Sequence, residues 1–310
     1  MSRIGIPGLG FTNKSGLLMA ESFISADSPL RPSCSSRAET ISTALSLAAD
    51  TADANRPALA WPAPPALWNL EGSDIHVWSA LLDRPTDALA RFGPTLAPVE
   101  TERAERFRFS RHRDRFVVGR GCLRAILASY LECDPAEIEF ANGPNGKPVL
   151  AGRFSLAGLH FNQAHSEDVM LAAVTRAGPI GVDVERIRAL PDAEELVRRF
   201  FSSREAEAFH LLPEDQRTVS FFNLWTRKEA WLKATGEGIT HSLSLVEVAF
   251  LPDEPARLLS IAGREALAAD WTLTDLQPAK DYAAALATLA RVSRINCWRW
   301  PQPESRGGES

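Results

Sequence analysis

The sequence predicts an α+β protein made of two pseudo-symmetric halves. Segments that alternate apolar and polar residues, as half-buried strands do, are separated by segments with an apolar stripe at helical spacing. The order strand, helices, strands occurs twice, before and after about residue 180, although the self-similarity of the sequence is faint. We therefore expect two halves, residues 67–180 and 181–300, each a small, mostly antiparallel sheet with packed helices.

The composition is typical of a soluble globular protein. The 310 residues are 45% hydrophobic and 24% charged, and the net charge of −5 gives no overall basic field to attract nucleic acid or an anionic membrane. No apolar run is long enough to cross a bilayer, and Gly, Pro and Asn interrupt the segment where a signal peptide would be apolar. The four cysteines are far apart and no zinc-binding cluster appears, which indicates reduced thiols and a cytoplasmic location.

Both ends of the chain differ from the part that is expected to fold. Residues 1–66 are rich in Ser, Ala and Pro and end in a proline-rich stretch, so we expect a disordered or loosely attached extension. A start codon placed too early would explain the same composition. Residues 301–310 are likewise expected to form a disordered tail.

The first half is expected to begin with a strand over 74–82 and helices over 99–109 and 114–131. Eight arginines lie between residues 103 and 124, but no aromatic residues repeat at a spacing that would stack nucleic-acid bases. We expect most of these arginines on the solvated side of a helix, while a few could form a phosphate cradle.

A turn and two strands complete the first half. Residues 143–148, GPNGKP, form a turn by composition, and Lys147 in it is either a solvated loop residue or a ligand contact. Strands are expected over 159–166 and 169–175. His165 near the end of the first strand is either a structural residue or a ligand contact, and spacing alone does not choose between these roles.

The second half opens with two acidic residues on one side of a strand. In the strand expected over 178–187, Asp183 and Glu185 are two residues apart and therefore point to the same side. Two clustered carboxylates suit Mg²⁺, which takes one or two protein carboxylates together with phosphate oxygens and water. An edge strand with two solvated acids is the alternative. The remaining elements are expected to be helices over 192–202, 203–212 (with Ser203 as N-cap) and 214–235, and strands over 246–252, 271–278 and 281–292.

The helix expected over 214–235 carries an acid–base pair on an apolar face. Glu229 and Lys233 are one turn apart on the face that also carries Trp225. Taken alone, such a pair is most often a surface pair that contributes about 0.3–0.5 kcal/mol. Other features of the chain have to decide between a surface pair and a site.

Three signals together resemble the 4′-phosphopantetheinyl transferase superfamily. They are GVDVE at 181–185, WTRKEAWLK at 225–233, and FNQAHS at 161–166 preceded by the GKP turn. The family is marked by G-[IV]-D-[IV]-E and, some forty residues later, W-x-x-K-E-[AS]-x-x-K, and every fixed position is present here. The resemblance runs from about residue 74 to about residue 298. It is to the larger, monomeric type, which acts on carrier domains of peptide and polyketide synthases.

The resemblance implies a reaction and the residues that perform it. The phosphopantetheine arm of coenzyme A would move to a serine of an apo acyl or peptidyl carrier protein, releasing 3′,5′-ADP, in an active site between the two halves. Mg²⁺ would be held by Asp183, Glu185 and Glu229. Glu229 is also a candidate base for the serine hydroxyl, and Lys233 would contact the reacting phosphate, so the expected catalytic residues are Glu229, Lys233 and Asp183.

The same resemblance implies basic residues around coenzyme A, whose terminal phosphate carries roughly two negative charges. The matching positions are Arg103, Lys147, His165 and Lys233. Arg115 is a weaker candidate. Two features depart from the family pattern: Ala164 replaces the usual serine before the histidine, and the N-terminal extension has no counterpart. Neither departure affects the metal carboxylates.

Two other functions fit part of the pattern. A catalytically idle coenzyme A-binding or carrier-docking protein would keep the fold without turnover, but the complete set of carboxylates and lysine argues against it. An unrelated Mg²⁺-dependent enzyme would cleave a diphosphate without any carrier protein. The sequence does not identify the carrier pathway or the tolerance for acyl-coenzyme A.

Overall fold

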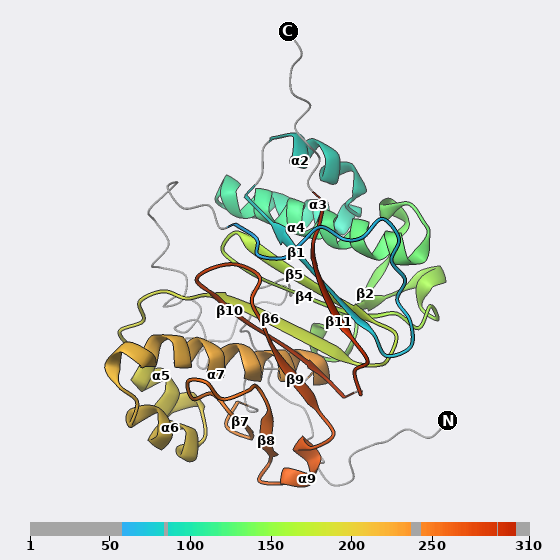
Figure 1. Cartoon of the computed structure of the whole chain (residues 1–310). Coiled ribbons are helices and arrows are strands. Elements are labelled where there is room, and N and C mark those ends of the chain that lie inside the picture. The colour runs from blue at the N-terminus through green and yellow to red at the C-terminus, as the bar shows by residue number, and fades with distance from the viewer. Residues whose placement is uncertain (1–57, 84–85, 237–242, 290, 302–310) are drawn as a thin grey trace, which may run out of the picture.

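The computed structural model describes residues 58–83, 86–236, 243–289 and 291–301, so the predictions for residues 1–57 and 302–310 lie outside the described residues. The main elements form four layers in the order helix, sheet, sheet, helix (Figure 1). Helix α4 (Ser110–Leu131) lies on the outer side of one sheet and helix α7 (Glu214–Thr235) on the outer side of the other.

The first half follows the predicted order of elements. Its strands are β1 (Ile75–Leu81), β2 (Phe140–Asn142), β3 (Pro148–Leu150), β4 (His160–Ser166) and β5 (Val169–Thr175). Its other helices are α2 (Thr86–Phe92) and α3 (Pro98–Glu105), with short 3₁₀ turns η1 (Gly93–Thr95), η2 (Pro135–Glu137), η3 (Pro144–Gly146) and η4 (Gly152–Phe154).

The second half repeats this order of elements, and the last strand of the chain then joins the sheet of the first half. The elements from here to the end of the chain are β6 (Ile180–Arg186), α5 (Ala193–Phe200), α6 (Ser203–His210), α7, β7 (Val246–Val248), β8 (Leu258–Ile261), α9 (Glu265–Ala268), β9 (Thr272–Leu276), β10 (Tyr282–Thr288) and β11 (Ile295–Arg299).

The two main sheets share one strand topology. In the first sheet, β1 pairs antiparallel with β5, and β5 pairs antiparallel with β4. In the second, β6 pairs antiparallel with β10, and β10 pairs antiparallel with β9. A 22-residue helix follows the first strand in each half. The predicted α+β fold with two similar, mostly antiparallel halves is therefore confirmed.

Several short or distant elements differ from the sequence expectations. β11 pairs in parallel with β1, so residues 295–299, which were expected in the second half, complete the first sheet. The hairpin of β2 and β3 and the strand β8 were not predicted, because three or four residues are too few to show a periodic pattern. β7 has three residues where seven were expected.

The N-cap prediction for α6 was wrong by one residue. Ser202, not Ser203, is the cap: its Oγ accepts a hydrogen bond from the Glu205 backbone N–H over 3.2 Å. In return, the Ser202 backbone N–H donates to Glu205 Oε2 over 3.1 Å. This reciprocal capping box satisfies two backbone donors that the helix itself leaves free.

Three apolar clusters explain the layers. One lies between α4 and the first sheet and includes Trp78 and Leu123. Another lies between α7 and the second sheet and includes Trp231. The third lies between the two sheets and includes Val182 and Ala164. Ala164 is therefore core packing, although the family pattern has a serine at this position.

The last residues of the predicted N-terminal extension are held against the fold. Leu59 forms an antiparallel bridge with Ala279, and the backbone N–H of Ala60 donates to the Pro278 carbonyl over 2.8 Å. None of the helices in the described ranges is long and apolar enough to span a membrane.

Most of the eight arginines lie on the solvated side, as expected, but Arg120 and Arg124 are buried in α4. Arg124 Nε donates to Glu100 Oε2 over 2.8 Å, and Arg120 Nε lies 3.2 Å from Glu100 Oε1. The side chain of Glu100 thus joins α3 to α4 through two buried ion pairs, which is a structural use of the arginines.

Candidate active site

The two strand carboxylates and the helix pair meet where β6 packs on α7. Asp183 and Glu185 lie on β6, while Glu229 and Lys233 are one turn apart on α7. The Lys233 ammonium donates to Asp183 Oδ1 over 2.6 Å, and both Asp183 and Glu229 are buried. The structure therefore brings together all four residues that the sequence placed in the metal and catalytic site.

Burial and crowding of charge shift the acidity of every member of this cluster. Burial, with the charge of Asp183, raises the pKa of Glu229 to about 8 and that of Glu185 to about 7. Burial also raises the pKa of Asp183, although Lys233 opposes the shift. Burial alone would lower the pKa of Lys233, but the charges of Asp183 and Glu229 outweigh it and the net pKa is raised. Lys233 alone does not balance the buried carboxyl groups of Asp183 and Glu229 together with the half-buried one of Glu185, so the site favours a further cation or bound protons.

Gly181 explains how β6 and α7 come so close. A Cβ atom on Gly181 would lie 2.0 Å from the carbonyl oxygen of Ala230 and 2.3 Å from the backbone nitrogen of Ala234. Both neighbours are backbone atoms of α7 and cannot move aside as a side chain can. The glycine of the GVDVE motif is therefore required for the close approach that joins Asp183 to Lys233.

The cluster has the chemistry of a site for a hard cation. Asp183 Oδ2 and Glu229 Oε1 are buried and make no hydrogen bond. Such oxygens cost free energy unless something compensates them, and Mg²⁺ prefers oxygen ligands. Across the described ranges, no three or more Asp, Glu, His or Cys side chains are already grouped for a metal ion. The residues fit Mg²⁺ by their chemistry, and their side chains would have to turn toward it.

Ser166 is a site residue that the sequence reasoning missed. Its Oγ donates to Glu185 Oε2 over 2.7 Å and accepts from the backbone N–H of Arg186 over 3.1 Å. Arg188 Nη1 lies 4.0 Å from the same Glu185 oxygen. Because Ser166 ends β4, these contacts join the first half to the second. Ser166 is the last residue of the FNQAHS motif, and this is the signal in the sequence that could have identified it.

His165 lies in the same region but is neutral. Burial lowers its pKa to about 4, and the charges of Lys233 and Arg115 lower it further. Arg115 pairs with Asp168 and lies 3.9 Å from Glu167 Oε2, so the turn after β4 balances its charge. At neutral pH, His165 can therefore offer a hydrogen bond to a ligand but not a positive charge.

Arg103 and Lys147, two other residues predicted to contact coenzyme A, each contact other groups of the protein. The guanidinium carbon of Arg103 lies 5.4 Å from the ring centre of Phe116, in a cation–π contact between α3 and α4. The Lys147 ammonium donates to the carbonyl of Ile180 over 2.8 Å and to that of Ala234 over 3.4 Å. Lys147 therefore contacts the backbone of the second half, and burial lowers its pKa to about 8.

The remaining motif lysine, Lys228, has a structural role. It is fully buried, and its ammonium donates to Glu205 and to the carbonyls of Leu243 and Val246, over 2.6 and 2.7 Å for the carbonyls. These three contacts use all of its hydrogens and join α7 to α6 and to β7. The Lys–Glu dipeptide of the motif thus puts one side chain into the core and the next into the site.

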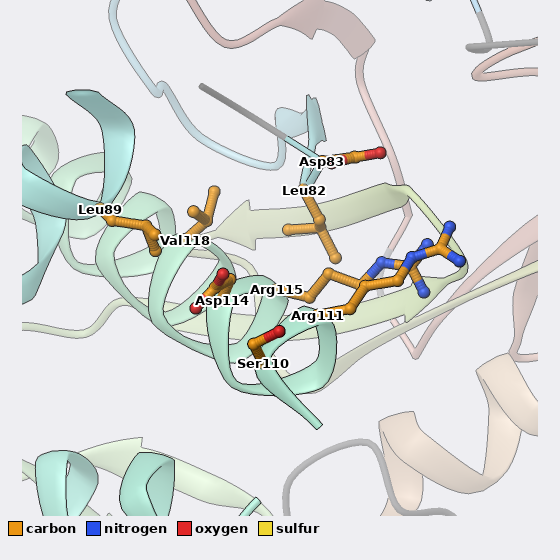
Figure 2. Close-up of a pocket in the computed structure, with 8 residues that line it drawn as sticks. All are labelled: Leu82, Asp83, Leu89, Ser110, Arg111, Asp114, Arg115 and Val118. Carbon is orange, nitrogen blue, oxygen red and sulfur yellow. The ribbon is translucent and has the colours of Figure 1, made fainter. Parts of the chain in front are cut away.

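A cavity of about 220 Å³ lies at the N-terminal end of α4 (Figure 2). Figure 2 shows Arg111 and Arg115 extending side by side from this end of the helix. The lining residues are Leu82, Asp83, Leu89, Ser110, Arg111, Asp114, Arg115 and Val118. None of the carboxylates of the site lines this cavity, and Arg115 is the only predicted contact that does.

Comparison with known proteins agrees with this geometry. Residues 179–287 match the family model of the 4′-phosphopantetheinyl transferase superfamily, and residues 84–176 match that of the 4′-phosphopantetheinyl transferase N-terminal domain. The chain belongs to the 4′-phosphopantetheinyl transferase superfamily. The predicted family and the predicted transferase activity are thereby confirmed.

Relatives of this transferase include proteins of Nostoc, Synechocystis and Bacillus. It is 42% identical over 239 residues to the 4′-phosphopantetheinyl transferase HetI of Nostoc sp., an overlap of 77% of this chain and 97% of HetI. It is 37% identical to a putative 4′-phosphopantetheinyl transferase of Synechocystis sp., over 58% of this chain and 70% of the relative. It is 28% identical to the transferase Sfp of Bacillus subtilis, over 56% of this chain and 76% of Sfp.

Proposed function

We propose that this transferase moves the phosphopantetheine arm of coenzyme A to a serine of an apo carrier protein in a Mg²⁺-dependent reaction. The cluster of Lys233 with the buried carboxyl groups of Asp183 and Glu229 is the observation that supports this proposal most directly. The reaction joins a serine oxygen to the phosphorus that bears the arm and breaks the diphosphate bond to 3′,5′-ADP. Groups that stabilise negative charge on that diphosphate would therefore accelerate it.

We propose Asp183, Glu185 and Glu229 as the residues that hold Mg²⁺. When bound there, Mg²⁺ would neutralise charge on the diphosphate oxygens. Lys233 would donate to the reacting phosphate, because its raised pKa keeps it protonated at neutral pH. Glu229 would also accept the serine proton, directly or through a water, in its ionised form. Ser166 would hold Glu185 in place through its 2.7 Å hydrogen bond.

We propose that coenzyme A is bound by Arg103, Lys147, His165 and Lys233. His165 is supported by its position near Lys233 and Arg115, where a neutral imidazole can donate to a phosphate oxygen. Arg103 is supported by its charge at the junction of α3 and α4. Support for Lys147 is weaker, because its ammonium already donates to two carbonyl groups.

The test is to incubate the full chain with coenzyme A, Mg²⁺ and a panel of apo acyl and peptidyl carrier proteins. We expect the mass of at least one carrier to increase by the arm, together with release of 3′,5′-ADP. Chelation of Mg²⁺ should stop transfer, and added Mg²⁺ should restore it. Binding of coenzyme A without any mass increase would contradict the proposal. Ranking the carriers by kcat/KM would identify the pathway served.

A substitution in the cluster tests the assignment of residues. Asp183→Asn keeps the shape of the side chain but removes its charge, so we expect kcat to fall by at least about 10²-fold. The surface residue Asp87 is the matched control, and Asp87→Asn should leave transfer unchanged. Wild-type kcat in the Asp183→Asn variant would contradict the proposed metal and phosphate site.

We further propose that the enzyme is a cytoplasmic monomer. The resemblance to the larger type of transferase and the pseudo-symmetric pair of halves in one chain support this proposal. Light scattering after size-exclusion chromatography tests the oligomeric state, and a mass of two chains would contradict it. Cell fractionation tests the location.

A further inference from the structure

We propose that residues 58–70, which we call the strap, position Glu185 for metal binding. The strap precedes β1 and ties the turn at residues 277–281, between β9 and β10, to β11 in the first sheet. The inference rests on the proposed function, because Glu185 is a proposed ligand of Mg²⁺. The matches to the two family models begin at residue 84 and assign the strap no role.

Backbone hydrogen bonds fix the strap to both sheets. On the second half, the Ala60 N–H donates to the Pro278 carbonyl over 2.8 Å. Two residues later, the Pro62 carbonyl accepts from the Arg299 N–H over 2.8 Å, at the end of β11. β11 is the edge strand of the first sheet, and Figure 1 shows the strap as the blue segment that crosses it. The strap therefore connects the second half to the edge of the first sheet.

The two tryptophans of the strap pack on different cores. Trp61 packs against the cluster between the two sheets. Trp68 packs against the cluster between α4 and the first sheet, where its ring centre lies 4.8 Å from that of Tyr130 and 5.2 Å from that of Trp78. Of the two, Trp61 is thus the one that holds the strap where the sheets face each other.

The turn that the strap contacts lies beside Glu185. In the antiparallel pair of β6 and β10, Glu185 is opposite Ala283. Two residues after Glu185, the Ile187 N–H donates to the Asp281 carbonyl over 2.7 Å. A displacement of the turn would therefore move the end of β6 on which Glu185 is carried.

Internal hydrogen bonds give this turn a fixed shape. Gln277 Nε2 donates to the Ala279 carbonyl over 2.7 Å and to the Tyr282 carbonyl over 3.0 Å. The side chains of Ala279 and Tyr282 are both buried between the sheets. A shift at Pro278, where the strap is attached, is consequently passed on to Asp281 and to β6.

The position of Glu185 depends on how the two sheets lie against each other. Its Oε2 accepts from Ser166 Oγ of the first half over 2.7 Å, while its backbone belongs to the second sheet. The strap links the same two sheets through β11 and the 277–281 turn. Partners that orient a metal ligand from outside the coordination shell typically change metal affinity by about 10–100-fold when they are lost. Loss of the strap contacts should therefore weaken Mg²⁺ binding.

The competing role for the strap is to cover apolar surface and nothing more. In that case, loss of Trp61 would lower thermal stability but leave the Mg²⁺ affinity of the folded enzyme unchanged. Mg²⁺ affinity measured well below the unfolding temperature distinguishes the two roles.

The experiment compares Trp61→Ala and Ala60→Pro in the full chain. Proline has no N–H, so Ala60→Pro removes the donor to the Pro278 carbonyl. Trp68→Ala is the matched control for a lost strap tryptophan, and Ala66→Pro introduces proline at an exposed position of the same segment. Calorimetry measures Mg²⁺ binding with coenzyme A present and no carrier protein. Transfer is measured against Mg²⁺ concentration, and thermal unfolding is recorded for each variant.

We expect Trp61→Ala to raise the Kd for Mg²⁺ about tenfold and Ala60→Pro about threefold. The Mg²⁺ concentration for half-maximal transfer should rise by the same factors. Trp68→Ala should lower the unfolding temperature while its Kd for Mg²⁺ stays within about twofold of wild type. Ala66→Pro should behave as wild type.

Two results would overturn the inference. One is a folded Trp61→Ala variant with the wild-type Kd for Mg²⁺, which would leave the strap as a cover. The other is an equal rise of that Kd in Trp68→Ala, which would indicate general loosening of the fold. If Trp61→Ala does not fold, a wild-type Kd in Ala60→Pro has the same meaning. A wild-type enzyme that binds no Mg²⁺ or transfers no arm would instead contradict the proposed function, so the two failures are distinguishable.

Discussion

Replacement of Gly181 by alanine should separate the two halves of the proposed catalytic cluster. The added Cβ would lie 2.0 Å from the Ala230 carbonyl oxygen, and real contacts of this kind are almost never shorter than 3.0 Å, so α7 must retreat by about 1 Å. Overpacking of this kind costs about 1–3 kcal/mol of folding free energy. The same retreat withdraws Lys233 from Asp183, and misplacement by 1 Å can lower the rate about 10²-fold.

The assay for Gly181→Ala is single-turnover transfer of the arm to an apo carrier protein, beside thermal unfolding of the same preparation. Gly93→Ala is the matched control, because a Cβ there meets no atom within 4 Å. It should leave both rate and unfolding temperature unchanged. A folded Gly181→Ala enzyme with a rate within threefold of wild type would show that the backbone contact does not set the spacing of the reacting groups.

Three further predictions concern folding stability. Lys228→Met should lower the free energy of unfolding by about 3–5 kcal/mol in a denaturant titration, because it leaves Glu205 buried and unpaired; a loss below 1 kcal/mol would contradict the buried pair. Burial lowers the pKa of His76 from 6.5 in the unfolded chain to about 4 in the folded protein. The neutral imidazole therefore contributes its full stabilisation above pH 6.5. As the pH falls from about 6.5 toward 4, the free energy of unfolding should decrease by up to about 1.4 kcal/mol per pH unit. The decrease of unfolding free energy in acid should be smaller in the His76→Phe variant. If the pH profiles of the variant and the wild type were identical, His76 would not be the group responsible. Trp298→Ala should lower the free energy of unfolding by about 3 kcal/mol, because Trp298 packs on Trp78 at 5.2 Å between β11 and β1; an unchanged unfolding temperature would show that the first sheet does not depend on β11.

Local periodicity made the proposed catalytic cluster predictable. Residues two apart on a strand and four apart on a helix share a side in any fold. Asp183 with Glu185, and Glu229 with Lys233, could therefore be paired before any tertiary structure was known. The GVDVE and WTRKEAWLK motifs, at the separation found here, then resembled those of the 4′-phosphopantetheinyl transferases. The structure agrees, because these pairs do meet across β6 and α7.

The contacts that depend on the meeting of distant segments could not be predicted. Ser166 holds Glu185 across the two halves, and no pattern within either strand requires that partner. Lys147 was expected beside coenzyme A, and its hydrogen bond to a carbonyl group at the end of α7 could not be predicted. A solvated helix face was expected for most of the eight arginines, and nothing in the sequence showed that Arg124 would be buried beside Glu100 of another helix.

The sequence by itself determined most of the longer helices and strands, their repeated order, and the pairing of Asp183 with Glu185 and of Glu229 with Lys233. All of these follow from residue chemistry and from periods of two or 3.6 residues. Only the tertiary structure decided that β11 returns to the first sheet and that the 143–148 turn closes the end of α7. Both contacts join segments at least 87 residues apart, and the groups that accept or pair there are backbone groups that every residue carries. Backbone groups leave no trace in a sequence, so their pairing is fixed only when the chain has folded.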